Sequence, residues 1–205
     1  MSRLLLLFFL GCSENSIAAD PTLAAGPPGE GEAVAVFAGG CFWCMEGPFE
    51  KLDGVVSVES GYAGGSEVGP TYQQVSMGRT SHLEAVRVLY QPDKVDYERL
   101  LEVFWHNIDP TQDNGQFCDK GPHYRSAVFV STAEERTAAT ESKAEAQSTL
   151  GRTVVTEVRD AGPFWLAEGY HQDFYKKNPT RYKSYRAGCG RDHRLQQLWG
   201  NKAGR

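Results

Sequence analysis

The chain has 205 residues, of which 40% are hydrophobic and 23% are charged. This composition excludes a wholly disordered chain and a multi-pass membrane protein, and the length suits one domain with short terminal segments. The net charge of −5 arises from 26 acidic and 21 basic residues without a long basic run, so we expect no nucleic-acid partner.

Residues 1–19 are typical of an export signal. A short positive segment precedes an unbroken apolar run from Leu4 to Leu10, which is too short to cross a bilayer. Two cleavage sites remain open: before Cys12, which would then carry a lipid anchor to the membrane, or after Ala19. We therefore expect an exported protein of the periplasm or cell envelope, with residues 20–32 as a flexible linker rich in Ala, Gly and Pro.

From residue 33 onward the pattern alternates between strands and helices. Strands are expected at 33–38, 55–62, 82–90, 126–130 and 153–158, and helices at 44–52, at 95–106 and from a capping box at Thr132 to just before Gly151. The residues after 158 show no clear period, and their aromatic side chains are expected to hold them to the body. This order predicts an α+β sandwich, with a mixed sheet, helices packed outside it and a long irregular C-terminal tail.

Cys41 lies at the expected turn between the first strand and the first helix. The unpaired N–H groups of a helix's first turn favour a thiolate, so the pKa of this thiol is expected to be lowered. The preceding Gly39-Gly40 lets the backbone approach a ligand closely, and Phe42 and Trp43 would form an apolar wall for a methyl-bearing group. Cys41 is thus the best candidate nucleophile; the other interpretation is an inert buried thiol.

Glu84 lies on the strand expected at 82–90, where it shares a face with Val86 and Val88. Because both faces of this strand are largely apolar, we expect Glu84 to be buried and protonated near neutrality, as a general acid must be. The other interpretation is a strand-end carboxylate that reaches solvent.

Tyr62, in a glycine-rich turn, and Tyr124, before a strand, either offer an O–H group to the pocket or are structural.

Six short motifs occur in a fixed order along residues 33–192. They are Gly40-Cys41-Phe42-Trp43, Gly61-Tyr62-Ala63-Gly64-Gly65, His82-Leu83-Glu84-Ala85-Val86, Asp109-Pro110-Thr111-Gln112, Asp119 with Tyr124-Arg125-Ser126-Ala127, and Tyr170-His171-Gln172. Any one of them is a weak signal, but the ordered set resembles the peptide methionine sulfoxide reductase A family. The resemblance marks 33–192 as the domain of that family and leaves 193–205 as a C-terminal tail.

The resemblance implies reduction of methionine S-sulfoxide, in oxidised proteins or as the free amino acid, to methionine. Cys41 would attack the sulfur, Glu84 would protonate the departing oxygen, and Tyr62 and Tyr124 would hydrogen-bond that oxygen. Cys41 would become a sulfenic acid, which a second thiol converts into an intramolecular disulfide. A thioredoxin-like donor would reduce this disulfide, and the resemblance implies neither a metal nor an organic cofactor.

The resemblance also implies which residues bind the substrate. Phe42 and Trp43 would hold the ε-methyl group, Asp119 would engage the substrate backbone or a bound water, and His171 belongs to the same group through its motif. We further expect the protein to act as a monomer.

The identity of the resolving thiol stays open at this point. Cys189, flanked by glycines in the tail, resembles the recycling cysteine of the family and is favoured. Cys44 completes a Cys41-x-x-Cys44 pattern, and Cys118 directly precedes Asp119. These two are either additional redox cysteines or packed thiols.

Two other functions compete with this interpretation. A thioredoxin-like disulfide oxidoreductase would use Cys41-x-x-Cys44, but it leaves Glu84 and the glycine-rich turn at Tyr62 without a role. A zinc-binding module needs two close pairs of ligands, which the isolated cysteines and histidines of the remaining chain do not provide.

Overall fold

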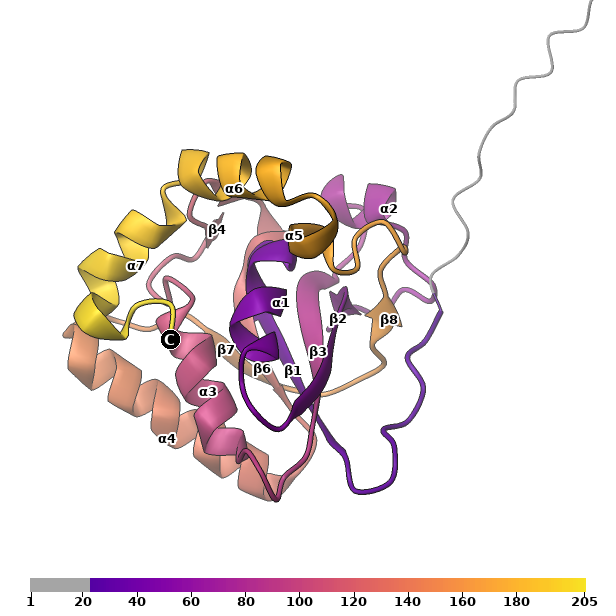
Figure 1. The fold of residues 1–205 in the computed structure, drawn as a ribbon, viewed down its shortest axis with the longest axis horizontal. Helices are drawn as coiled ribbons and strands as arrows, with labels where there is room; N and C mark the ends of the chain where they lie inside the picture. Colours follow the sequence, from indigo (N-terminus) through magenta and orange to yellow (C-terminus); the bar gives the residue numbers. More distant parts are fainter. Residues whose placement is uncertain (1–22) are drawn as a thin grey trace, which may run out of the picture.

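The structure is a computed structural model that describes residues 23–205. The expected export signal, including Cys12, lies outside the described residues. The centre of the fold is a six-stranded mixed sheet in the order β7-β6-β1-β3-β2-β8 (Figure 1). Its neighbouring strands are antiparallel except for β6 and β7, which are parallel. The expected α+β fold with a mixed sheet is confirmed.

The elements have the following bounds. The sheet contains β1 (Ala33–Gly39), β2 (Val55–Ala63), β3 (Leu83–Tyr90), β6 (Ser126–Val130), β7 (Glu157–Asp160) and β8 (Trp165–Leu166), and a separate ribbon contains β4 (Gly115–Gln116) and β5 (Asp119–Lys120). The helices are α1 (Trp43–Glu50), α2 (Tyr72–Ser76), α3 (Tyr97–His106), α4 (Ala133–Leu150), α5 (Phe174–Lys177), α6 (Pro179–Gly188) and α7 (Arg191–Trp199). Single 3-10 turns cover Pro122–Tyr124 and Gly200–Lys202.

Local signals explain where α3 begins and where α4 begins and ends. The Asp96 side chain accepts a hydrogen bond from the Arg99 N–H at 2.7 Å and begins α3. Thr132 caps α4 by accepting from the Glu135 N–H at 3.2 Å, and Gly151, with a φ of 60°, ends it in the left-handed conformation that glycine favours. The expected boundaries of α4 are confirmed, and α3 begins two residues later than expected.

The C-terminal part differs from the expectation, because the segment expected to be irregular forms α5, α6 and α7, which follow one another along the margin of the molecule in Figure 1. Helix α6 buries none of its residues, so its sequence carries no apolar period from which a helix could be predicted. The strand expected at 153–158 is instead β7, because the N–H groups of Val154 and Val155 bond to Gln147 Oε1 and the Pro110 carbonyl before the sheet is reached.

The two faces of β3 contribute to two different apolar cores. Val86 and Val88 pack in the larger one, beneath α1 and α3, whereas Leu83 and Ala85 pack in a smaller one on the opposite face. The alternation expected for this strand is therefore confirmed, and the buried Glu84 lies on the face that packs in the larger core.

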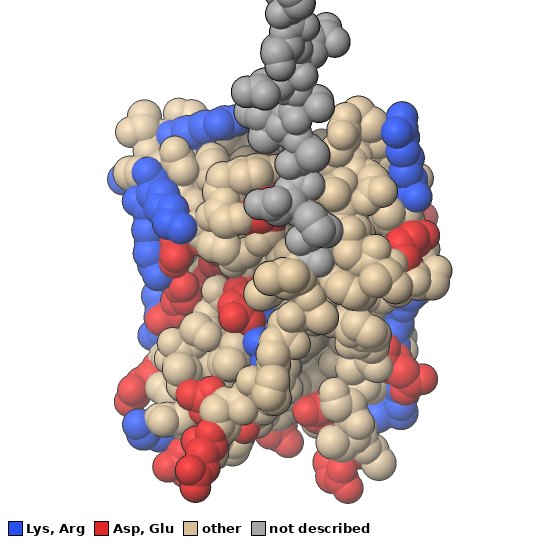
Figure 2. Space-filling view, turned by 90° about the vertical axis from the view of Figure 1, so that its right-hand side faces the viewer, with Lys and Arg blue, Asp and Glu red and all other residues tan. Residues whose placement is uncertain are grey.

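The segment 23–26, inside the expected linker, runs beside β8. The Leu166 N–H donates to the Leu23 carbonyl at 2.8 Å, and the Ala25 N–H donates to the Phe164 carbonyl at 2.9 Å. Acidic and basic side chains are both present on the face shown in Figure 2. Among the described residues, we find no helix with the length and apolar character needed to cross a membrane.

Candidate active site

Cys41 sits between the end of β1 and the start of α1. Gly40, with a φ of 82°, makes this turn, and a Cβ atom there would come within 2.4 Å of Gln116 Cβ, so only glycine fits. The Cys44 N–H donates to the Cys41 carbonyl at 3.0 Å and forms the first turn of the helix. Cys41 and Cys44 are both buried free thiols.

Glu84 reaches the same turn from β3. It is 1% exposed, lies opposite Tyr62 in the β2–β3 register, and its Oε2 accepts a hydrogen bond from the Phe42 N–H at 3.2 Å. Burial raises the pKa of Glu84 to about 8, although the bond from Phe42 acts in the other direction. The expected burial is confirmed, a pKa of about 8 favours the protonated form near neutrality, and the carboxyl group lies directly beside the peptide of Cys41.

The expectation of a lowered pKa for the Cys41 thiol is wrong for this state of the protein. Burial raises its pKa, and the hydrogen bond with Cys44 and the charge of Glu84 act in the same direction. The hydrogen bond from Cys41 and the positive charge of Arg191 instead lower the pKa of Cys44 to about 6. The Phe42 N–H, at the start of the helix, donates to Glu84 rather than to the Cys41 sulfur.

Arg191 supplies this positive charge from inside the protein. It is 1% exposed, and its Nη2 donates to the carbonyls of Gly39 at 3.2 Å and Asn107 at 2.8 Å. Its guanidinium group lies 4.3 Å above the Phe117 ring, and the described residues offer it no carboxylate ion pair. The nearby Cys44 thiol is therefore a site where negative charge is stabilised.

Three tyrosines surround the carboxyl group of Glu84. Tyr62 donates its O–H to Glu168 Oε2 at 2.9 Å, and Tyr124 shares a hydrogen bond with Tyr72. Burial raises the pKa of Tyr62 and of Tyr124, and the charge of Glu84 adds to both effects. Both phenols therefore keep their protons and remain hydrogen-bond donors near the site.

Phe42 and Trp43, which the sequence predicted as an apolar wall, lie against His171, and the three rings form the aromatic wall of the site. Trp43 Nε1 donates to His171 Nδ1 at 3.1 Å, and the ring centroids of Phe42 and His171 are 4.9 Å apart. Trp43 also stacks on Phe174 at 3.7 Å. Burial lowers the pKa of His171 to about 4, so the imidazole is neutral and its Nδ1 can accept the bond from Trp43.

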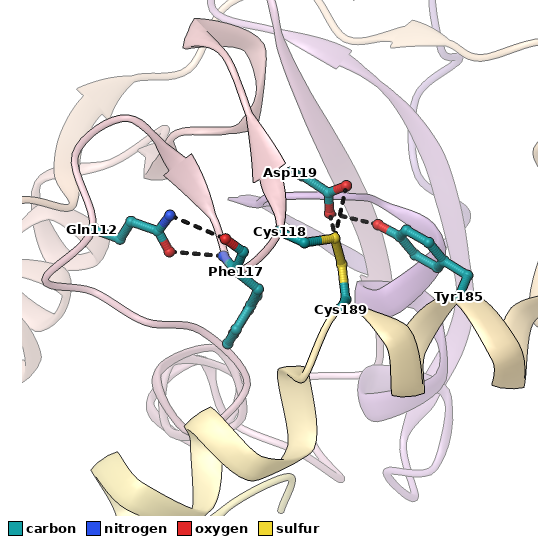
Figure 3. Close-up of a disulfide and its surroundings, with 6 residues drawn as sticks. All are labelled: Gln112, Phe117, Cys118, Asp119, Tyr185 and Cys189. Carbon is teal, nitrogen blue, oxygen red and sulfur yellow. Dashed lines mark hydrogen bonds between the residues drawn. A yellow bond between two sulfur atoms is a disulfide. The ribbon is translucent and has the colours of Figure 1, made fainter.

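The remaining two cysteines of residues 23–205 are bonded to each other. Cys118 and Cys189 form a disulfide with a Cα–Cα distance of 4.9 Å, so the expected resolving thiol is oxidised here and its partner is Cys118 rather than Cys41 (Figure 3). Asp119, the expected substrate-binding residue, lies beside both sulfurs. In this form neither sulfur is a thiolate that could bind a metal ion.

Tyr185 of α6 joins the two cysteine pairs and is a site residue that the sequence did not reveal. Its side chain hydrogen-bonds with Cys41 and donates to Asp119 Oδ2 at 2.5 Å (Figure 3). The sequence showed only an aromatic residue expected to hold the tail. Since α6 has no apolar face, its spacing gave no reason to select this tyrosine.

A protonated carboxyl group beside a buried thiol can deliver a proton to an oxygen that leaves while the thiol attacks, which places the protein among the thiol-dependent oxidoreductases. The model of the peptide methionine sulfoxide reductase family matches residues 33–203. The chain belongs to this family, and the thioredoxin-like alternative is not supported.

Individual relatives agree with this assignment. The chain is 50% identical to peptide methionine sulfoxide reductase MsrA 2 of Caulobacter vibrioides over 201 residues, covering 98% of this chain and 100% of the relative. Among solved structures, methionine sulfoxide reductase A of Corynebacterium diphtheriae has a TM-score of 0.70 at 30% identity, covering 78% of this chain and 89% of that one. Reduced Mxr1 of Saccharomyces cerevisiae has a TM-score of 0.71 at 31% identity, covering 76% and 90%.

Proposed function

We propose that this protein reduces the S epimer of methionine sulfoxide, in oxidised proteins and as the free amino acid. The Cys41 sulfur attacks the sulfoxide sulfur, and the sulfoxide oxygen is protonated and transferred to Cys41, which becomes a sulfenic acid as methionine leaves. A second thiol then displaces this oxygen as water and forms a disulfide. The net change is one sulfoxide reduced, one disulfide formed and one water released.

The observation that carries this proposal is the position of Glu84. A fully buried carboxyl group with a pKa of about 8 is protonated near neutrality, and it lies one hydrogen bond from the peptide that follows Cys41. General acid catalysis needs a proton donor of this kind within reach of the reacting oxygen. Tyr62 and Tyr124, which also keep their protons, are proposed to hydrogen-bond the same oxygen.

Four residues are proposed to bind the substrate. Phe42 and Trp43 hold the ε-methyl group, His171 fixes the Trp43 indole through the Nε1–Nδ1 hydrogen bond, and Asp119 engages the substrate backbone or a bound water. The aromatic wall supports the first three roles, because apolar faces discriminate a methyl group from a charged one.

Cys189 is the proposed resolving thiol. Its sulfur lies beside Asp119, which Tyr185 connects to Cys41 by hydrogen bonds, and Gly188 and Gly190 on either side give its backbone freedom to move once the disulfide is reduced. Cys44 is the second candidate, because it already shares a hydrogen bond with Cys41.

The proposed reductant is a thioredoxin-like dithiol protein, with no metal or organic cofactor. Yeast Mxr1 has been solved in complex with Trx2, and that chain shares this fold with a TM-score of 0.52 at 20% identity. The apolar run at Leu4–Leu10 supports export to the periplasm or cell envelope, with Cys12 as the candidate site of a lipid anchor. An exported enzyme would take its electrons from a donor on the same side of the membrane. We propose that it acts as a monomer.

Single-turnover reduction of the S and R epimers of a methyl sulfoxide tests this function. The reduced protein should convert about one equivalent of the S epimer without added reductant and lose thiols in pairs. Cys41→Ser should abolish this turnover. Cys189→Ser should keep it but lose disulfide formation, whereas the same result for Cys44→Ser would assign resolution to Cys44. Equal turnover of both epimers, or turnover by Cys41→Ser, would contradict the proposal.

A further inference from the structure

We propose that the Cys118–Cys189 disulfide is a second redox centre, which an external dithiol opens at Cys118 while Asp119 protonates the departing Cys189 sulfur. This inference rests on the proposed function, because it names the disulfide on which the oxidation of Cys41 ends. It also gives Asp119 a role in sulfur chemistry in addition to the substrate contact.

The arrangement of the three side chains carries the proposal. Asp119 Oδ1 lies 3.7 Å from Cys118 Sγ, and Oδ2 lies 3.9 Å from Cys189 Sγ, so one carboxyl group borders both sulfurs (Figure 3). Cys118 is exposed, whereas Cys189 and Asp119 are partly buried. An incoming thiolate therefore reaches Cys118 first, and the sulfur next to Asp119 Oδ2 becomes the leaving group.

The surroundings of Asp119 keep its carboxyl group available as a proton carrier. Burial raises its pKa, while Tyr185 on α6, Arg191 on α7, His123 on the 3-10 turn and Lys120 on β5 all act to lower it. The charge of Asp119 also raises the pKa of Glu84 on β3. Burial, the largest of these influences, favours the protonated form of the carboxyl group, which is the form that can give a proton to a departing sulfur.

The reductive step balances as follows. The external thiolate attacks Cys118 Sγ, a new S–S bond forms, and the Cys118–Cys189 bond breaks with its electron pair on Cys189 Sγ. The proton of Asp119 moves to that sulfur and leaves a carboxylate. The second thiol of the donor then displaces Cys118 and forms the donor's own disulfide, so two electrons enter the protein.

The oxidative direction connects this centre to Cys41. The Cys189 thiol gives its proton to the Asp119 carboxylate, and its sulfur displaces the sulfenic oxygen of Cys41. The proton then passes from Asp119 to that oxygen, which leaves as water. Cys118 then attacks Cys189, which forms the Cys118–Cys189 bond and returns Cys41 as a thiol. Tyr185 hydrogen-bonds both Cys41 and Asp119 and so holds the Asp119 carboxyl group between the Cys41–Cys44 pair and the Cys118–Cys189 pair.

The test measures opening of this disulfide without any sulfoxide. In the full chain with Cys12→Ser, Cys41→Ser and Cys44→Ser, Cys118 and Cys189 are the only cysteines, and dithiothreitol reduces their bond. The rate constant is divided by the thiolate fraction of dithiothreitol at each pH. In this parent protein, the corrected rate constant should be about tenfold higher below the pKa of Asp119 than above it. The expected increase is smaller than that of typical general acid catalysis, because a thiolate is already a good leaving group.

Asp119→Asn should remove this pH-dependent step from the rate profile. Asp113→Asn, at an exposed residue just before the β4–β5 ribbon, should keep it. Tyr185→Phe should move the step to higher pH, because the Tyr185 hydrogen bond lowers the pKa of Asp119. A merely structural role would change the rate equally at every pH. A parent profile without the step, a step that survives in Asp119→Asn, or its loss in Asp113→Asn would overturn the proposal.

A second measurement locates the attack. Glutathione, a monothiol, should leave its mixed disulfide on Cys118 when the parent is trapped by acid and mapped by mass spectrometry. Glutathione on Cys189 would overturn the proposal. Neither measurement uses the Cys41 reaction, so their failure leaves the single-turnover result of the proposed function unaffected.

Discussion

Replacing Glu84 by glutamine should change both the rate of sulfoxide reduction and the pH dependence of stability. Glu84→Gln keeps the size of the side chain but has no proton to transfer. With a pKa of about 8, the wild-type group is about nine-tenths protonated at neutrality. Its loss should reduce the single-turnover rate by about 10²- to 10⁴-fold. The wild-type rate should fall as pH rises through about 8, and the variant should lack that fall.

The stability effect follows from the same pKa. The folded protein keeps this proton between pH 4.5 and about 8, whereas the unfolded chain releases it, so the wild-type free energy of unfolding falls as pH rises through that interval. At about 1.4 kcal/mol per pH unit, the interval corresponds to about 5 kcal/mol. Glu84→Gln should lose this slope, and its stability relative to wild type should rise by that order of magnitude.

Urea unfolding at the two ends of the interval, with the disulfide intact, measures this difference. The other titrating groups are common to both proteins and cancel in the comparison. Glu141→Gln, on the exposed surface of α4, is the matched control and should keep the wild-type slope. Parallel pH profiles for wild type and Glu84→Gln would refute the inference that the buried carboxyl group is protonated in the folded state.

Three further predictions concern the cysteines and the aromatic wall. Cys118→Ser should lower the free energy of unfolding by about 4 kcal/mol, because the disulfide closes a span of 71 residues; the variant should match reduced wild type in urea. In the reduced protein, the ultraviolet absorbance of the Cys44 thiolate should titrate near pH 6. Arg191→Met should move this titration to higher pH, and an unchanged titration would contradict the assignment to Cys44. Trp43→Phe loses the hydrogen bond to His171 and should raise KM about fivefold with kcat nearly constant, as steady-state kinetics would show.

The sequence by itself determined the features that depend on near neighbours. The two-residue period of β3 placed Glu84 on a buried face, and the cap at Thr132 placed the start of α4. The glycines before Cys41 marked the turn between β1 and α1. These properties follow from spacing along one segment, so no knowledge of the rest of the chain is needed to predict them.

Tertiary structure alone decided the features that join distant segments. Cys118 and Cys189, 71 residues apart, meet because α6 and α7 bring the tail to the β4–β5 ribbon, and no local pattern encodes that pairing. Tyr185 enters the site from a helix without an apolar face. The lower pKa of the cysteine pair belongs to Cys44 rather than Cys41. Burial and the charge of Glu84 raise the pKa of Cys41, whereas the hydrogen bond from Cys41 and the charge of Arg191 lower the pKa of Cys44. Electrostatic effects of this kind depend on which groups lie within a few ångströms, and only the packed chain fixes those distances.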